Sequence, residues 1–133
     1  MRYMLDTNIC IYVIKRKPAD VIERFKRTPI SDIGISSITL SELMYGAKKS
    51  SKPEQNFLAL SQFAAPLEIL PYDDNAARYY GDVRTYLEKK GTPIGSLDML
   101  IAAHALSAAS TLVTNNEKEF SRIHDLKIEN WAS

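Results

Sequence analysis

Four acidic residues stand where the chain changes from one predicted element to the next. Asp6 follows a short apolar run, and Glu42 and Asp98 fall near the beginnings of two segments with helical periodicity. Glu119 falls in a short helical segment after a later apolar run. If these residues meet in the fold, ionised carboxylates at close range repel one another, and a divalent cation removes that penalty. Oxygen ligands with few His or Cys nearby suit Mg²⁺ or Mn²⁺ rather than zinc.

Each acid also has an ordinary structural explanation. The segments Thr39–Glu42 and Asn116–Glu119 both have the spacing of a capping box. Asp98 lies two residues after the predicted cap Ser96, where the helix dipole favours a negative charge. Asp6 could cap the helix that follows it. Capping is the better explanation for each acid taken singly, except Asp6, but a capping carboxylate can also face a catalytic site.

The elements that must position these acids alternate between short apolar runs and longer helical periods. Strands are predicted for residues 3–5, 33–35, 67–70, 111–114 and near 127–128. Helices are predicted for residues 9–14, around 21–25, 40–47, 53–63, from 76 until Gly91, 97–108 and around 120. This alternation predicts an α/β fold, a three-layer α/β/α sandwich with a mainly parallel central sheet. In such sheets ligands bind beyond the carboxyl ends of the strands, where the four acids are expected to lie.

The composition predicts one soluble domain spanning residues 1–133. The chain is 45% hydrophobic and 25% charged, which is typical of globular proteins and excludes disordered and coiled-coil classes. The single cysteine, Cys10, excludes an intrachain disulfide and suits a reducing cytoplasm. Asp6 and Asn8 interrupt the apolar N-terminus before a signal peptide could form. The apolar run Ile9–Ile14 is far shorter than the ~20 residues that span a membrane.

The net charge of +1 is too small for a general binder of polyanions, but it is unevenly distributed. Residues 1–60 hold ten Lys and Arg against six Asp and Glu, whereas residues 61–133 hold seven against ten. The basic residues of the first half form three clusters, which are Lys15–Lys17, Arg24 with Lys26 and Arg27, and Lys48 with Lys49 and Lys52. A solvated surface explains any one cluster. Together they are candidates for contacts with an RNA backbone.

Four segments carry a recognisable order of motifs. They read MLDTN at 4–8, TLSEL at 39–43 with Gly46, PIGSLDMLIAAHA at 93–105, and LVTNNEKEF at 112–120 with the terminal ENW at 129–131. In this order they resemble the motifs of PIN-domain ribonucleases, most closely the VapC-type toxins of bacterial toxin–antitoxin pairs. The resemblance covers the whole chain. It implies a Mg²⁺-dependent endoribonuclease that acts on structured RNA, often tRNA, and a homodimer that a VapB-type antitoxin inhibits.

The resemblance also implies roles for the acids. Asp6 and Asp98 correspond to the principal metal ligands, and Glu42 and Glu119 complete the acidic pocket, directly or through metal-bound water. Many relatives have Asp in place of Glu119 and an additional Asp in place of Asn116. Asn116 therefore keeps an oxygen ligand and loses a charge, which leaves the number and affinity of the metal ions open.

Polar residues beside the acids complete the predicted site. Thr7, Asn8 and Ser96 could orient the carboxylates or water, although capping explains them equally well. His104 lies six residues beyond Asp98, about 9 Å along a helix, so the two cannot share an ion whose ligands lie near 2.1 Å. His104 is therefore predicted to be a core or interface histidine.

The predicted reaction is hydrolysis of a phosphodiester by a metal-activated water, with Glu42 or Asp98 taking the proton. Its products carry 5′-phosphate and 3′-hydroxyl ends. A non-catalytic PIN-like module that binds RNA or protein is an alternative, although all four acidic positions are retained. An aspartyl-phosphate enzyme with Asp6 as nucleophile is another, but such phosphatases usually have a second Asp where this chain has Asn8.

Overall fold

A five-stranded parallel sheet forms the centre of the structure, a computed structural model that describes residues 1–132. All four pairs of neighbouring strands are parallel, which confirms the predicted α/β sheet. The strand order is β3-β2-β1-β4-β5, so β1 lies between β2 and β4. The strands are β1 (Tyr3–Leu5), β2 (Ile33–Ser36), β3 (Glu68–Leu70), β4 (Thr111–Val113) and β5 (Ile128–Glu129).

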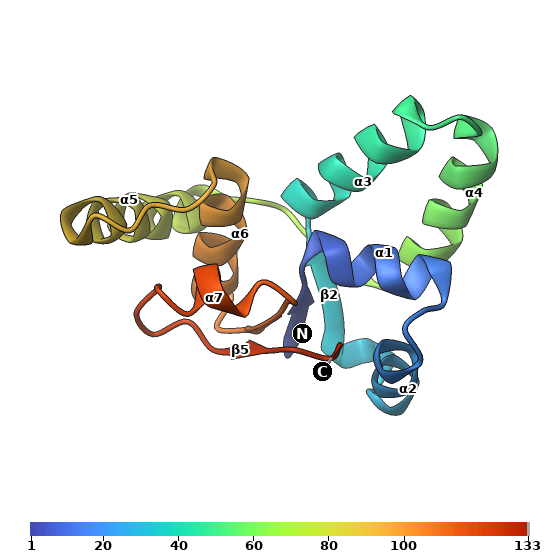
Figure 1. Cartoon of the computed structure of the whole chain (residues 1–133), viewed down its shortest axis with the longest axis horizontal. Helices are drawn as coiled ribbons and strands as arrows, with labels where there is room; N and C mark the ends of the chain where they lie inside the picture. Colours follow the sequence, from blue (N-terminus) through green and yellow to red (C-terminus); the bar gives the residue numbers. More distant parts are fainter. Residues whose placement is uncertain (133) are drawn as a thin grey trace.

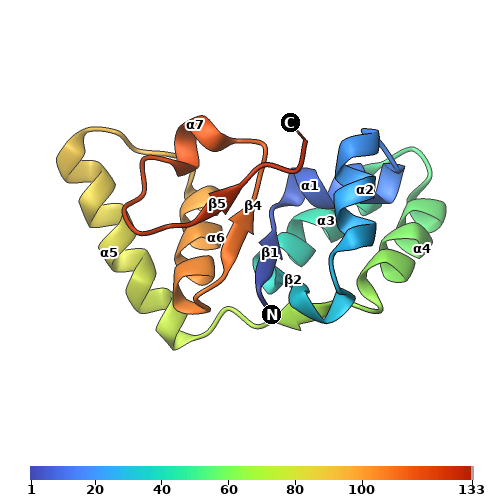
Figure 2. The same cartoon turned by 90° about the horizontal axis from the view of Figure 1, so that it is seen from below.

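Helices cover both faces of this sheet and complete the three predicted layers. Figures 1 and 2 show α1 to α4 on one side of the sheet, and α5, α6 and α7 on the other. The helices are α1 (Thr7–Lys15), α2 (Ala19–Arg27), α3 (Ser37–Lys49), α4 (Pro53–Ala64), α5 (Asp74–Lys90), α6 (Ser96–Ser107) and α7 (Glu117–Phe120), and a 3₁₀ turn covers Ile30–Asp32.

The alternation of side chains along β1 divides the interior into two cores. Tyr3 and Leu5 pack into the core on the side of α1 to α4, and Met4 packs into the core on the side of α5 and α6. Successive side chains of a strand point to opposite faces, so three apolar residues in a row serve both layers. This explains why β1 is buried along its whole length, as expected of a central parallel strand.

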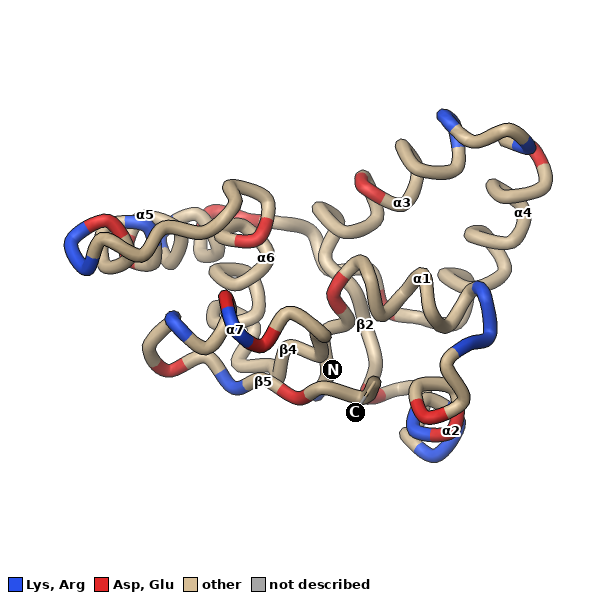
Figure 3. Tube along the Cα trace, in the orientation of Figure 1, with Lys and Arg blue, Asp and Glu red and all other residues tan. Residues whose placement is uncertain are grey.

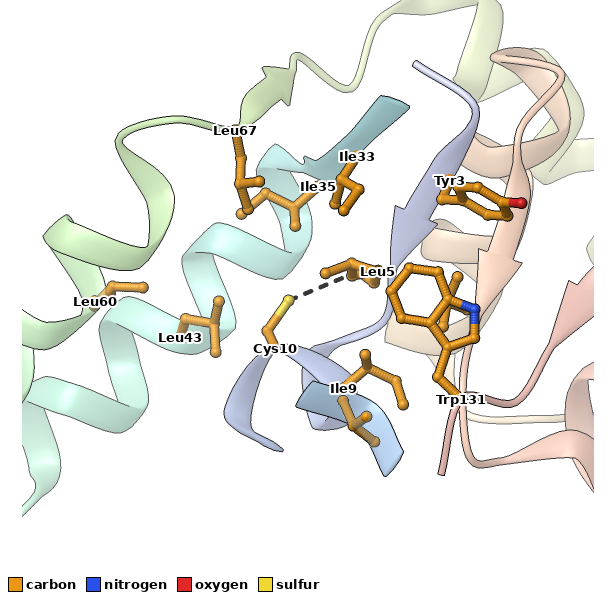
Figure 4. Packing of buried hydrophobic residues seen from close by; sticks show 12 residues of the cluster. Tyr3, Leu5, Ile9, Cys10, Ile33, Ile35, Leu43, Leu60, Leu67 and Trp131 are labelled. Atoms are coloured by element: carbon orange, nitrogen blue, oxygen red, sulfur yellow. Dashed lines mark hydrogen bonds between the residues drawn. The ribbon is translucent and has the colours of Figure 1, made fainter. Parts of the chain in front are cut away.

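The first core also fixes the C-terminal end of the chain to the sheet (Figure 4). The ring of Trp131 meets the ring of Tyr3 edge to face, with 5.5 Å between the centroids. The guanidinium of Arg24 lies 5.3 Å from the Trp131 ring and forms a 2.9 Å ion pair with Glu129. Cys10 is buried in the same core, as predicted, with its Sγ 3.9 Å from the Leu5 carbonyl oxygen.

Two helix starts differ from the prediction, and both helices carry an acid of the predicted site. Helix α3 begins at Ser37, because the Ser36 hydroxyl accepts a hydrogen bond from the Ile38 N–H. The predicted capping box at Thr39 is therefore wrong, and Glu42 lies in the second turn. The cap position of α6 is Gly95 rather than Ser96, and it makes no side-chain bond.

The other two predicted caps have different outcomes. Asp6 does cap α1, since its carboxylate accepts a hydrogen bond from the Thr7 N–H. Asn116 occupies the cap position of α7, but its side chain makes no capping bond. Its amide instead donates a hydrogen bond to the Glu119 carboxylate.

Within residues 1–132, none of the helices is both long enough and apolar enough to cross a membrane.

Candidate active site

Asp6 lies at the carboxyl end of the central strand and is the most buried of the four acids. Its side chain is 5% exposed, and both oxygens accept hydrogen bonds, Oδ1 from the Thr7 N–H at 2.7 Å and Oδ2 from the Thr114 hydroxyl at 2.8 Å. Burial raises the pKa of Asp6 above its ordinary value of 3.8, and the two hydrogen bonds act in the opposite direction. The carboxylate is thus held in one orientation in a setting that disfavours its charge.

Thr7 connects Asp6 to the second acid, Glu42. Its backbone N–H donates to Asp6, and its hydroxyl donates to Glu42 Oε1 at 2.8 Å. Glu42 reaches this position from the second turn of α3, so the contact links the start of α1 to the middle of α3. The predicted orienting role of Thr7 agrees with this geometry.

Asp98 lies in the first turn of α6 and is half-buried. Burial is the main reason that the pKa of Asp98 rises from 3.8 to about 6, and the charges of Asp6, Glu119 and Glu42 raise it further. An added Cβ at Gly95 would lie 3.7 Å from Asp98 Oδ2, so this carboxylate packs closely against the preceding loop. The charges of three other carboxylates thus add to the effect of burial on Asp98.

Glu119 completes the group from the short helix α7. Its Oε2 accepts a hydrogen bond from Asn116 Nδ2 at 3.2 Å. The next residue, Phe120, is fully buried in the second core and fixes this short helix to the body of the protein. The chain thus places Glu119 on an anchored turn and supports its carboxylate with an amide.

The acidic group is an electrostatic cluster rather than a closed coordination cage. Among residues 1–132, no three Asp, Glu, His or Cys side chains lie close enough together to form a metal-binding group. Asp6, Glu42 and Glu119 are instead held by hydrogen bonds from Thr and Asn donors. The assignment of all four acids to one cation therefore stays a prediction. The atoms that the four acids offer to a metal ion are carboxylate oxygens, which are the ligands that a hard cation prefers.

Two of the predicted orienting residues make no direct side-chain hydrogen bond to the acids within residues 1–132. Asn8 and Ser96 are exposed, and in the part of the chain that the structure describes their side chains donate no hydrogen bond to any of the four acids. Asn116 does contact one acid, Glu119. His104 is buried, as predicted for a core histidine, and its Nδ1 lies 2.7 Å from the Ser36 hydroxyl.

Thr114 is a residue of the site to which the sequence analysis gave no role. Strands β1 and β4 pair with Leu5 opposite Val113, so the next residues, Asp6 and Thr114, leave the sheet side by side. The Thr114 hydroxyl donates to Asp6 and accepts a hydrogen bond from the Asn116 N–H at 3.0 Å. A polar residue directly after each of two neighbouring strands is the signal that could have revealed this contact.

Charges of the opposite sign lie at the far ends of α1 and α3, two of the helices that begin near the cluster. Figure 3 shows Lys and Arg positions at the ends of α1 and α3, away from the acids. A groove of about 320 Å³ between α1, α3 and α4 is lined by both Lys15 and Glu42. The basic end of α1 and one member of the cluster, Glu42, therefore border the same groove.

Comparison with known proteins gives matches along nearly the whole chain. The model of a family described as PIN domain matches residues 3–126. The chain is 49% identical over 132 residues to the tRNA(fMet)-specific endonuclease VapC of Salmonella typhimurium, covering 99% of each protein. It is also 49% identical to Ribonuclease VapC2 of Rickettsia felis, covering 98% of each.

Two solved structures with similar chains are VapBC complexes bound to DNA. The DNA-bound VapBC of Salmonella typhimurium contains a chain with a TM-score of 0.93 at 49% identity, and the match covers 98% of both chains. VapBC2 of Rickettsia felis, bound to a DNA fragment from its promoter, contains one with a TM-score of 0.90 at 48% identity, covering 98% of this chain and 99% of that one.

Proposed function

Since this chain belongs to the PIN-domain family, as a ribonuclease of the VapC type, we propose that it cuts tRNA in a reaction that depends on Mg²⁺, with tRNA(fMet) as the first candidate substrate. The observation that carries the proposal is that Asp98, whose burial raises its pKa, also feels the charges of Asp6, Glu119 and Glu42, and its pKa rises to about 6. Such a cluster favours a bound cation, because a positive charge offsets the repulsion between the ionised carboxylates.

The four acids have distinct places in the proposed mechanism. Asp6 and Asp98 would hold the cation, and Glu42 and Glu119 would complete its surroundings directly or through water. Mg²⁺, or Mn²⁺ in its place, supplies Lewis-acid activation of water and neutralises charge on the scissile phosphate. The donor set fits such an ion, because it consists of oxygen atoms on rigid elements and includes no sulfur or imidazole.

The remaining groups orient the acids and handle the proton. Thr114 and the Thr7 N–H hold the two oxygens of Asp6, and the Thr7 hydroxyl holds one oxygen of Glu42. The second oxygen of Glu42 is then free to take a proton from the attacking water. Hydrolysis by water leaves a 5′-phosphate and a 3′-hydroxyl, so a 2′,3′-cyclic product would contradict this mechanism.

The basic clusters at the ends of α1 and α3 are the proposed contacts for the RNA backbone. Lys15 and Glu42 line the same groove, so a phosphate bound at the end of α1 would lie on the surface that leads to the acids. Each contact between a phosphate and a lysine or arginine makes the affinity for RNA fall more steeply as the salt concentration rises. We expect substitutions in Lys15–Lys17 to raise KM for RNA and to reduce this salt dependence.

We further propose that the chain forms a homodimer and that a VapB-type antitoxin inhibits it in the cytoplasm. The similar chains solved in VapBC complexes support an antitoxin partner. The acidic cluster suits an inserted arginine, which forms paired hydrogen bonds with carboxylates. An antitoxin arginine and Mg²⁺ would then compete for the same negative charge.

The decisive experiment compares purified wild-type protein with Asp6→Asn on tRNA(fMet) and on total tRNA, with Mg²⁺ and with EDTA. Asparagine retains the shape and the helix-capping ability of Asp6 and removes its charge. The matched control is Asp82→Asn, which neutralises an exposed residue of α5. We expect cleavage only by wild type and the control, and only with Mg²⁺. Cleavage that survives EDTA or Asp6→Asn would refute the metal mechanism, and binding of tRNA without cleavage would support the non-catalytic alternative.

A further inference from the structure

We infer that His104 is a positioning residue that sets the placement of α6 relative to α3, the helices that carry Asp98 and Glu42. The inference rests on the proposed function, since it concerns the geometry of that site. His104 is 3% exposed and touches none of the four acids by hydrogen bond. Its role must therefore pass through the residues that it contacts.

The first contact is a buried hydrogen bond between α6 and the cap of α3. His104 Nδ1 lies 2.7 Å from the hydroxyl of Ser36, which is fully buried. The Ser36 hydroxyl already accepts the Ile38 N–H at 3.0 Å and so caps α3. Among residues 1–132 its proton has no other acceptor than His104 Nδ1. Ser36 therefore donates to an unprotonated Nδ1, and the imidazole hydrogen is on Nε2.

The second contact fixes the plane of the imidazole ring. Tyr72, in the connection between β3 and α5, meets the His104 ring edge to face, with centroids 5.5 Å apart and an interplanar angle of 80°. The Tyr72 N–H donates to the Ser37 hydroxyl at 3.0 Å. The two consecutive serines Ser36 and Ser37 at the start of α3 are thus hydrogen-bonded to His104 and Tyr72, whose rings pack against each other. Burial lowers the pKa of His104, and the charge of Asp73 acts in the opposite direction. The lowered pKa keeps the ring in the neutral form that accepts the hydrogen bond from Ser36.

The spacing along the two helices transmits this placement to the acids. Ser36 lies six residues before Glu42, and His104 lies six residues after Asp98, so each bond partner is about 9 Å along its helix from an acid. Rigid helices carry a shift at one point to the other. A displacement of about 1 Å in a catalytic group can cost about 100-fold in rate. Loss of the Ser36–His104 bond is therefore expected to act on the chemical step.

The test uses three variants of the pair. His104→Leu removes the acceptor and keeps an apolar side chain, Ser36→Ala removes the donor, and His104→Asn retains an acceptor near the position of Nδ1. We expect His104→Leu and Ser36→Ala to lower kcat about tenfold and leave KM for tRNA unchanged. His104→Asn should restore most of kcat. The double variant that combines His104→Leu with Ser36→Ala should be no slower than Ser36→Ala alone. The size of the Mg²⁺-induced rise in Tm should fall in parallel with kcat.

The control is Val83→Ala, which weakens the core beneath α5 and α6 and leaves this hydrogen bond in place. It should lower Tm while kcat stays at the wild-type level below the transition. If His104→Leu also lowers Tm without changing kcat, or if His104→Asn is as slow as His104→Leu, the inference is wrong. Should His104→Leu fail to fold, Ser36→Ala and His104→Asn make the same comparison.

A spectroscopic measurement tests the bond itself, apart from any activity. The chain has only two histidines, so a His124→Gln variant assigns the imidazole ¹⁵N signals of His104. We expect Nδ1 in the unprotonated and Nε2 in the protonated chemical-shift range at neutral pH. A protonated Nδ1 would overturn the inference even in an active enzyme. An inactive wild type with the expected imidazole signals and Mg²⁺ response would instead contradict the proposed function alone.

Discussion

Replacing Asp98 by Asn should make the metal-free protein more stable while removing its activity. Asp98 has a folded-state pKa of about 6 because of its burial and the charges of Asp6, Glu119 and Glu42. A carboxyl group whose pKa is raised by folding binds its proton more tightly in the native state than in the unfolded state. The free energy of unfolding therefore falls as pH rises from about 4 to about 6, and it stays at the lower level above pH 6.

The magnitude follows from the pKa of Asp98. The difference between about 6 and the ordinary 3.8 corresponds to about 3 kcal/mol at about 1.4 kcal/mol per pKa unit. Because Asp98 is only half-buried, solvent screening reduces this to about 1–2 kcal/mol. The amide also loses a favourable interaction of about 0.3–1 kcal/mol with the N-terminus of α6. The net gain of about 1 kcal/mol corresponds to a rise of about 3–5 °C in Tm for a chain of this length.

Thermal unfolding in EDTA at pH 7.5 and pH 4 measures this effect. The Tm of Asp98→Asn should be higher than that of wild type at pH 7.5. The gain should largely vanish at pH 4, because the protonated Asp98 of the folded wild type is then uncharged, like asparagine. Mg²⁺ at pH 7.5 should raise the Tm of wild type, because a ligand that binds only the folded state stabilises it, and should raise that of Asp98→Asn much less. Asp82→Asn serves as the exposed control. A variant less stable than wild type at pH 7.5 in EDTA would refute the electrostatic reasoning.

Three further substitutions test single contacts. Thr7→Val should lower kcat about 10- to 100-fold with little change in Tm, because it removes the donor to Glu42 and keeps the backbone N–H to Asp6; cleavage at the wild-type rate would exclude an orienting role. Asn116→Asp should lower Tm in EDTA and tighten Mg²⁺ binding in calorimetry, since it puts a second negative charge beside Glu119; an unchanged Mg²⁺ affinity would contradict it. Thr39→Val should raise the free energy of unfolding by about 1 kcal/mol in urea titrations, because the Thr39 hydroxyl is buried without a hydrogen-bond partner in residues 1–132; a loss of stability would indicate a partner such as a bound water.

The sequence predicted the sheet well because its strands follow from local patterns. Short apolar runs separated by helical periods are sufficient to identify parallel strands, and a polar residue directly after a run marks its carboxyl end. Asp6 and Thr114 both follow this rule. The contact between them required one more piece of information, the pairing of Leu5 with Val113, which depends on which strands are neighbours.

The helix starts were harder to predict because several hydroxyl residues compete for one cap. Ser36, Ser37 and Thr39 all stand before the apolar face of α3, and any of them could accept a helical N–H. Ser36 caps α3 in the structure because β2 ends there and the helix follows without a loop. The bond from Ser36 to His104 joins residues 68 positions apart, so no local pattern could have indicated it.

The same fold that assembles the acids also keeps them from closing on one another. Asp6 and Glu42 are held by Thr donors and Glu119 by Asn116, so these three carboxylates have a fixed partner before any cation arrives. Asp98 has no such side-chain donor within residues 1–132, and its pKa is the one raised to about 6. Burial also raises the pKa of Asp6, but the largest electrostatic cost of the site falls on Asp98 at the start of α6. A cation or an antitoxin arginine would gain most by neutralising Asp98, and for this reason the placement of α6 is the feature of the fold to which the site should be most sensitive.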